Sequence, residues 1–284
     1  MSKDKNQNNL GLVGLFVLLV LGLIVLSLLL KLFFIFRDSK FDGTHNFIVG
    51  FAGKSQTELV SFNPQNKTIS TITVKENLDK NALSKSLEIP IDGVINVDKN
   101  IEDKDISSVL LKFASPFASS LDGLTFIDAF RLSVFAKSVQ SGSIYDRSFS
   151  ANLNDAQRAT LLTLSFTDST IYQENLGIQI INASDVVGVG GRLASLVTNI
   201  GGNPILVSTA DNPLNTSKII YYKTKSYTAQ KLSDYLGFPI EESDEKGIAD
   251  VIIIIGKDKL VGSIFKYVLV NSSFTFCRLF FISA

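Results

Sequence analysis

The chain carries few of the residues that most often do chemistry in enzymes. Among 284 residues it has one histidine, His45, and one cysteine, Cys277. A single cysteine cannot form an internal disulfide, and a single histidine cannot supply a histidine-rich zinc site. The composition also offers no convincing Ser-His-Asp arrangement. These counts argue against classical thiol, zinc and triad chemistry. We name no catalytic, metal-binding or cofactor-binding residues and expect no cofactor.

A glycine-rich turn is the next candidate, because such a turn can bind the phosphates of a nucleotide. Gly188, Gly190 and Gly191 follow a predicted strand and precede a predicted helix, and Asp211 lies at roughly the spacing of an acid that binds ribose. The third position of the fingerprint is Leu193, where glycine or alanine would let the helix pack closely on the strand. We interpret these glycines as serving backbone geometry and entry into the helix.

The elements around this turn predict a C-terminal domain over residues 176–258. Its apolar periodicity and turn residues predict the order β-α-β-β-α-β, the ferredoxin-like arrangement, with two helices on one face of one sheet. The predicted strands are 178–181, 204–208, 218–222 and 250–255, and the predicted helices are 190–200 and 227–236.

A second α/β domain is predicted over residues 41–172. Alternating β-branched residues over 68–74, after the turn Asn63-Pro64-Gln65-Asn66, indicate the second strand of a hairpin whose first strand is 58–62. Further strands are predicted over 46–51 and 94–97, and helices over 82–87, 106–117 and 124–137. The expected fold class is therefore α/β (α+β).

An uncharged run from Leu10 to Leu30 predicts a transmembrane helix. About 21 residues at about 1.5 Å each span roughly 31 Å, which matches the roughly 30 Å hydrocarbon core of a bilayer. A cleaved signal peptide has a shorter apolar core of about 7 to 15 residues, followed by a small-x-small site. Here the apolar residues continue to Phe36, so we predict an uncleaved anchor over 10–36 after a cytoplasmic tail over 1–9.

The net charge argues against a nucleic-acid partner, but the basic residues around the anchor do not determine its orientation. Lys+Arg 27 cancels Asp+Glu 27, so we expect no nucleic-acid partner. Lysines and arginines flank the anchor on both sides, so the positive-inside rule does not decide its direction. A tail over 259–284 is apolar and aromatic but is interrupted by Lys266 and Arg278. Interfacial contact, packing on the domain and an aberrant read-through end all stay open for this tail.

Residues 176–258 resemble the LytR C-terminal domain. The matching segments are IQIINAS at 178–184, GVGGRLA at 188–194, IIYY at 219–222, AQKL at 229–232 and ADVIIIIGKD at 249–258. Such domains follow membrane anchors in bacterial envelope proteins. The resemblance thus implies a single-pass protein of the cell membrane, with its N-terminus inside and the bulk of the chain extracytoplasmic.

Residues 41–172 resemble the opening part of a LytR-CpsA-Psr domain, although a generic α/β spacer domain is the alternative. The matching segments are FIVG at 47–50, LVSFNP at 59–64 and IPIDGVINVD at 89–98. That family moves lipid-linked glycan phosphates onto the cell wall with acidic and arginine residues around a pyrophosphate. The chain departs from the family pattern, because Gln56-Thr57 replaces an Asp-Thr pair and Lys75-Glu76-Asn77 replaces Pro-Arg-Asp. Arg131, Arg147 and Arg158 are dispersed and fit no arginine motif of the family.

Two functional hypotheses follow from these resemblances. In the first, a degenerate LytR-CpsA-Psr-like domain and a LytR C-terminal domain bind or scaffold cell-wall components, such as peptidoglycan or a wall glycopolymer, without catalysis. In the second, the chain is a phosphotransferase that attaches glycopolymers to the wall through other carboxylates, such as Asp92, Asp98 and Glu102. Those acids lie in a turn-rich stretch without a nearby cluster of basic residues, which favours the first hypothesis.

Overall fold

The computed structural model describes residues 4–74, 84, 87–97, 105–115, 120–148, 154–245 and 247–258. The chain divides into two compact units, residues 1–40 and residues 41–284. The predicted tail over 259–284, most of the predicted helix over 82–87, and Lys75, Glu76, Asn77, Asp98 and Glu102 lie outside the described residues.

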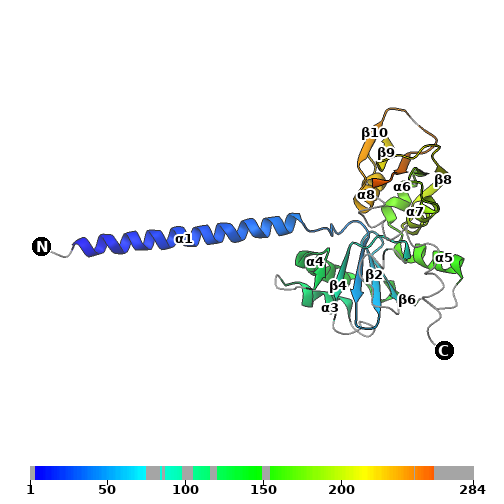
Figure 1. Cartoon of the computed structure of the whole chain (residues 1–284). Coiled ribbons are helices and arrows are strands. Elements are labelled where there is room, and N and C mark those ends of the chain that lie inside the picture. Colours follow the sequence, from blue (N-terminus) through cyan, green and yellow to red (C-terminus); the bar gives the residue numbers. More distant parts are fainter. Residues whose placement is uncertain are drawn as a thin grey trace. The chain divides into compact units, whose positions relative to one another are not determined.

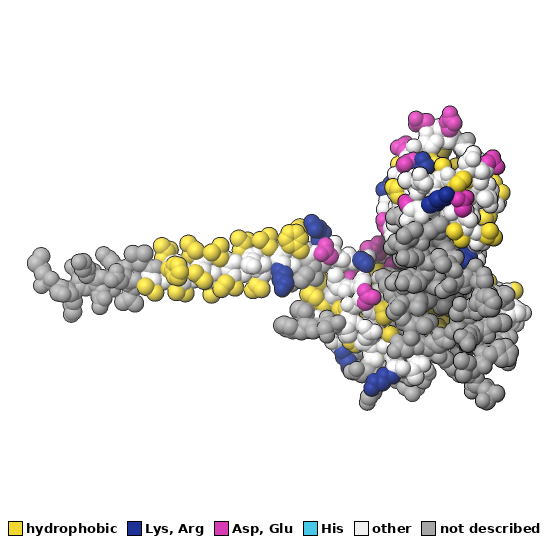
Figure 2. All heavy atoms as spheres, viewed as in Figure 1, with side chains coloured by type: hydrophobic (Ala, Val, Ile, Leu, Met, Phe, Trp, Pro, Cys, Tyr) yellow, Lys and Arg dark blue, Asp and Glu magenta, His cyan; other side chains and the backbone are white. Residues whose placement is uncertain are grey.

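The first unit is built on one long helix, α1 (Asp4–Arg37) (Figure 1). Within it, Val13–Lys31 is long and apolar enough to cross a membrane, with a mean hydropathy of 3.1 and none of its surface buried. Hydrophobic side chains line this helix in Figure 2. It is the candidate membrane span that the uncharged run predicts.

The second unit begins with a six-stranded mixed sheet in the order β5-β4-β1-β2-β3-β6. The strands are β1 (Phe47–Ala52), β2 (Thr57–Asn63), β3 (Thr68–Val74), β4 (Gly93–Asn96), β5 (Leu121–Asp122) and β6 (Ile144–Ser148). β1, β2 and β3 pair antiparallel, whereas β4 and β6 run parallel to β1 and β3. The predicted hairpin is confirmed, with Asn63 opposite Thr68 at its turn.

Helices cover both faces of this sheet. The helices are α3 (Ile106–Phe113), α4 (Phe126–Ser138) and α5 (Asp155–Phe166), with a short 3-10 turn η1 (Ser141–Ser143). On β1, Phe47 and Val49 point into a core shared with α3 and α4, while Ile48 points into a second core that contains Phe166 of α5. The result is a three-layer domain, in which β1 and β2 are buried along their whole length.

The second sheet has five strands in the order β10-β9-β11-β7-β8. Its strands are β7 (Gly177–Asn182), β8 (Asn203–Thr209), β9 (Lys218–Tyr222), β10 (Ile240–Ser243) and β11 (Val251–Ile255), and its helices are α6 (Ser169–Glu174), α7 (Val189–Asn199) and α8 (Tyr227–Leu236). β7 and β8 are parallel neighbours joined through α7, and β9 and β10 are parallel neighbours joined through α8.

The α/β class is confirmed, but the predicted ferredoxin-like arrangement is wrong. Strand β10 is additional, and the parallel neighbours β7–β8 and β9–β10 do not occur in an all-antiparallel ferredoxin-like sheet. The sequence over 240–243 is Ile-Glu-Glu-Ser. Its two adjacent acids interrupt the alternation of apolar and polar residues from which a strand is predicted. Charged residues are tolerated there because β10 is an edge strand.

The expected helix-covered face of this second sheet is confirmed. Side chains at alternate positions of β7 and β11, such as Ile180 and Ile253, are fully buried in a core with α7 and α8. Ile171 of α6 joins the same core. The alternate side chains on the other face, such as Ile252, are only partly buried.

Candidate functional site

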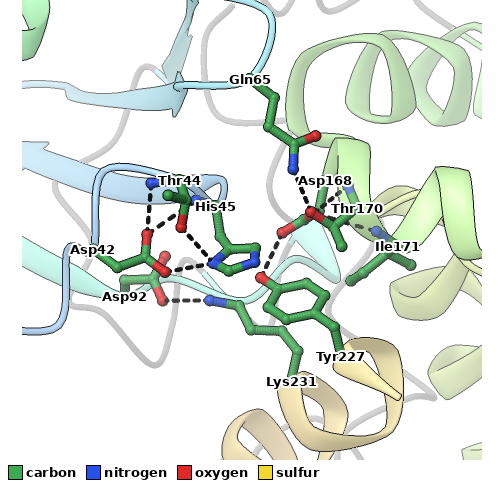
Figure 3. Close-up of polar contacts among 10 residues, drawn as sticks. All are labelled: Asp42, Thr44, His45, Gln65, Asp92, Asp168, Thr170, Ile171, Tyr227 and Lys231. Carbon is green, nitrogen blue, oxygen red and sulfur yellow. Dashed lines mark hydrogen bonds and ion pairs between the residues drawn. The ribbon is translucent and has the colours of Figure 1, made fainter.

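The candidate site lies where the loops that precede β1 and β4 meet helices α6 and α8 of the second sheet (Figure 3). It combines the histidine of the chain with three carboxylates, a lysine and a tyrosine: Asp42, His45, Asp92, Asp168, Tyr227 and Lys231.

Asp42 organises the loop before β1. Its carboxylate accepts hydrogen bonds from the backbone N–H groups of Thr44 (2.8 Å) and His45 (3.0 Å), and it also contacts Nδ1 of the His45 ring. Burial by itself raises the pKa of Asp42, but the hydrogen bonds from His45 and Thr44 together lower that pKa well below its ordinary value. The carboxylate is therefore charged and fixes the orientation of the imidazole.

The His45 ring lies flat against Tyr227, the first residue of α8. The two ring centroids are 4.1 Å apart and the planes are 11° from parallel. The Tyr227 hydroxyl donates a 2.9 Å hydrogen bond to Oδ2 of Asp168, whose Oδ1 caps the N-terminus of α6. Burial and then the charge of Asp168 raise the pKa of Tyr227, so its hydroxyl stays a neutral donor.

Asp92 forms a second bridge between the two sheets. Its Oδ2 accepts a 2.8 Å hydrogen bond from the backbone N–H of Ile48 in β1, and its Oδ1 lies 3.8 Å from Nζ of Lys231 in α8. The two side chains are 9% and 17% exposed. Lys231 also lies over the ring of Tyr235, with its nitrogen 4.7 Å from the centroid.

Two further groups of polar contacts lie beside this one. Nε of Arg192 in α7 lies 3.0 Å from a carboxylate oxygen of Glu88, and Asn199 donates to the Glu88 carbonyl at 3.0 Å. At the hairpin turn, Asn63 and Asn66 each donate to the Ser169 hydroxyl at 3.0 Å. Within the described part of the chain, every buried side-chain nitrogen and oxygen has a hydrogen-bond partner.

This arrangement joins the loops of the first sheet to the helices of the second. Each of its carboxylates is engaged by a backbone N–H or by a side chain of another element, and hydrogen bonds to charged groups contribute about 1.5–3 kcal/mol each. Among the residues that the structure describes, no group of three or more His, Cys, Asp or Glu side chains could hold a metal ion.

A comparison with known protein families identifies the part of the chain that contains the second sheet, α7 and α8. Residues 175–258 match the family model described as "LytR cell envelope-related transcriptional attenuator". This part of the chain is a LytR C-terminal domain. The match begins directly after α6 and ends just beyond β11, so it contains the Tyr227 and Lys231 side of the site.

Solved structures show weaker similarity over more of the chain. Bacillus subtilis TagT is 15% identical with a TM-score of 0.27, covering 39% of this chain and 82% of that one. Lin1025 from Listeria innocua is 13% identical with a TM-score of 0.19, covering 80% and 100%. B. subtilis TagV is 11% identical with a TM-score of 0.18, covering 70% and 99%. No curated protein matches the chain.

Two of the three glycines in the candidate nucleotide turn, Gly188 and Gly190, have structural explanations. Gly188 has a φ of 86° and begins α7 in the left-handed region. A Cβ at Gly190 would lie 2.9 Å from Cγ1 of Val207, so this glycine lets α7 approach β8. Leu193 is buried in the core, and Asp211 is exposed in the turn after β8. Gly188 and Gly190 thus have the role in backbone geometry that the sequence predicts, whereas a Cβ at Gly191 would meet no atom within 4 Å.

The residues singled out by the resemblance to LytR-CpsA-Psr domains are scattered. Gln56 donates to Glu58 at 3.4 Å beside the start of β2. Arg131 lies on α4, Arg147 donates from β6 to Ser165, and Arg158 lies on α5. Asp92 reaches the site, and the other two acids of the enzyme hypothesis, Asp98 and Glu102, lie outside the described residues.

Sequence reasoning missed His45, Tyr227 and Lys231 as partners. From its residue type, His45 suggests only metal or triad chemistry. Tyr227 has the pattern of an ordinary first residue of a helix, and Lys231 that of an ordinary position within an amphipathic helix. The spacing Asp42-x-x-His45 could have indicated a local turn held by the acid, since aspartate often hydrogen-bonds to backbone groups just after it. Nothing in the sequence pairs that turn with α8.

Proposed function

We propose that this chain is a membrane-anchored protein of the bacterial cell envelope that binds or scaffolds cell-wall components without catalysis. The LytR C-terminal domain supports the cell-envelope assignment, and α1 supports a single span. We further propose that residues 41–172 form a degenerate LytR-CpsA-Psr-like domain and that both domains lie outside the cell, with the N-terminus inside.

The observation that carries the non-catalytic role is the position of Asp92. An acid that binds a metal ion or acts as a base needs a carboxylate oxygen directed at the substrate. In this chain one oxygen of Asp92 is bonded to the backbone of β1 and the other faces Lys231 of the LytR C-terminal domain. The acid is therefore part of the contact between domains.

Substitutions in the sequence support the same proposal. Glu76 stands where the related family has the arginine of Pro-Arg-Asp, and it would place a negative charge beside a substrate diphosphate. Gln56 lacks the carboxylate that would bind magnesium. Loss of a charged donor removes about 1.5–3 kcal/mol of attraction, and the repulsion adds to that loss.

Binding and turnover can be measured on the same preparation. The full chain, purified in detergent, should be retained on isolated peptidoglycan or on peptidoglycan that carries its glycopolymer, and comparing the two polymers identifies the ligand. With magnesium and a polyprenyl diphosphate it should show no turnover. Turnover that is lost in Asp92→Asn but kept in Asp122→Asn, a matched change at an exposed acid of β5, would establish the phosphotransferase instead.

The anchor and its orientation have their own test. The chain should stay with membranes after carbonate extraction, and protease added to intact spheroplasts should digest the region after Arg37. Protection of that region until lysis would reverse the orientation, and release by carbonate would contradict the anchor.

A further inference from the structure

Helix α4 is fixed to the point at which the folded domain leaves the anchor. Phe41 is the first residue of the second unit, and its side chain is buried. Its backbone N–H donates to Asp128 of α4 at 2.9 Å, and its ring lies 6.2 Å from that of Phe135, also on α4. Arg131 of α4 lies 5.8 Å from the Phe41 ring centroid. The first residue of the domain is therefore packed directly on α4.

The connection to the anchor is short. The residues Arg37, Asp38, Ser39 and Lys40 separate Phe36, the last apolar residue of α1, from Phe41. A fully extended chain covers at most about 3.6 Å per residue, so Phe41 lies within about 18 Å of Phe36. A bilayer that holds α1 is therefore within reach of Phe41 and of α4, which packs on Phe41.

The outward face of α4 is apolar. Phe130 and Val134 are 52% and 56% exposed, and with Lys137 they follow the i, i+4, i+7 spacing that places side chains on one face of a helix. The opposite face buries Ile127 and Leu132 in the domain. Because α4 presents apolar side chains in both directions, its packing in the domain does not account for Phe130 and Val134.

The charges of α4 match a negatively charged surface. Its acid, Asp128, is fully buried and turned toward the capping residue Thr125. Lys137 lies on the exposed face, and the half-buried Arg131 lies six positions earlier on the same helix. Exposed aromatic and aliphatic side chains flanked by basic ones are the composition of helices that lie in the interface of anionic bilayers.

We propose that the face of α4 formed by Phe130, Val134 and Lys137 docks on the bilayer in which α1 is anchored. Phe130 and Val134 enter the headgroup region, and Lys137 meets anionic lipid. The proposal rests on the proposed membrane anchoring and adds a second, non-spanning contact that holds the first domain against the membrane.

Because the sequence contains no tryptophan, all indole fluorescence of a variant comes from the one tryptophan introduced into it. Phe130→Trp and Val134→Trp each introduce a single indole on the proposed face. Leu164→Trp is the matched control, because Leu164 is 64% exposed on α5, which covers the opposite face of the same sheet. The full-length variants are reconstituted into vesicles of phosphatidylcholine and phosphatidylglycerol, with and without brominated acyl chains.

We expect the indoles at positions 130 and 134 to show blue-shifted emission and to lose most of it in brominated vesicles, while the indole at position 164 keeps its emission. Adding Lys137→Glu to Phe130→Trp should weaken the quenching in phosphatidylglycerol vesicles.

Flotation of the same samples separates the two proposals. Chain that floats without quenching at 130 and 134 overturns the docking alone, and chain that does not float overturns the anchor as well. A blue shift without quenching that grows with protein concentration indicates a second copy on this face and also overturns the docking.

Discussion

The two sheets of this protein are covered differently. In the first domain, helices lie on both faces, and β1 and β2 are buried at every position. In the LytR C-terminal domain, helices lie on one face, and β7 and β11 alternate between buried and partly buried side chains. Loss of side-chain volume is therefore costly at every position of a strand buried on both faces, whereas on a strand covered on one face it is costly mainly at every second position.

The largest expected effect contrasts one isoleucine from each sheet. Ile48→Ala removes a buried side chain of β1 and should lower the free energy of unfolding by about 2–5 kcal/mol. Ile254→Ala removes a partly buried side chain from the uncovered face of β11 and should lower it by about 1 kcal/mol or less. Urea unfolding of the full chain in detergent measures both. Equal losses would mean that the second face is covered as well.

A smaller effect is expected where α6 supports the LytR C-terminal domain. The Glu174 carboxylate accepts hydrogen bonds from the backbone N–H groups of Tyr227 (3.0 Å) and Thr228 (2.8 Å) at the start of α8. Glu174→Gln should therefore lower the stability of this domain by about 1.5–3 kcal/mol. Glu245→Gln, at an exposed acid after β10, is the control for loss of charge and should change stability by about 0.5 kcal/mol or less. A comparable loss of stability in both variants would contradict the role of Glu174 in supporting α8.

The next prediction concerns pH and the contact between the domains. Tyr227 has a raised pKa in the folded protein, so above its ordinary value of 10.0 the unfolded chain loses a proton that the folded chain keeps. The stability from Tyr227 is thus fully present below pH 10 and declines as the pH rises above it. Tyr227→Phe should cost about 0.5–1.5 kcal/mol near neutral pH through the lost hydrogen bond to Asp168. The difference in free energy of unfolding between the parent protein and Tyr227→Phe should decrease above pH 10.

The exposed Tyr172 on α6 provides the control for this measurement. Tyr172→Phe should stay close to the parent protein at every pH, because its ring is not part of the contact between domains. A gap between parent and Tyr227→Phe that is constant from pH 7 to pH 11 would contradict the prediction.

The smallest effect is expected for the Glu88–Arg192 pair. Both side chains are about one quarter exposed, so screening by water limits the pair to about 0.5–1 kcal/mol. A double-mutant cycle with Glu88→Gln and Arg192→Met should give a coupling energy in that range, and the coupling should fall as salt is added. A coupling that is insensitive to salt would indicate a drier contact than the structure shows.

Local patterns predicted most of the fold. The strands 68–74 and 218–222 and the helix 227–236 agree with the structure to the residue, because β-branched alternation and helical apolar spacing are properties of short segments. The predicted helix 106–117 is too long, since α3 ends at Phe113. The edge strands β6 and β10 were missed, because exposed and charged residues replace the alternating pattern there.

The candidate site could not be predicted in the same way. His45 and Tyr227 come from different domains, and their contact depends on how the loop before β1 meets α8. Asp92 was identified as an acid, but its partner Lys231 reads as an ordinary position of an amphipathic helix. The periodicity of a sequence does not indicate which surfaces pack against one another. The site is formed by such a contact, so the sequence could not predict it.

The contact between the domains also determines how the protein would bear a mechanical load. Under the proposed function, binding of wall polymer by the LytR C-terminal domain of a chain anchored before Phe41 would put the contact between the two sheets under tension. The force enters beside Asp42 and His45, and the covalent connection runs through residues 167–176 to the second sheet. Polar contacts such as Asp92–Lys231 lie parallel to that connection and should yield before either apolar core.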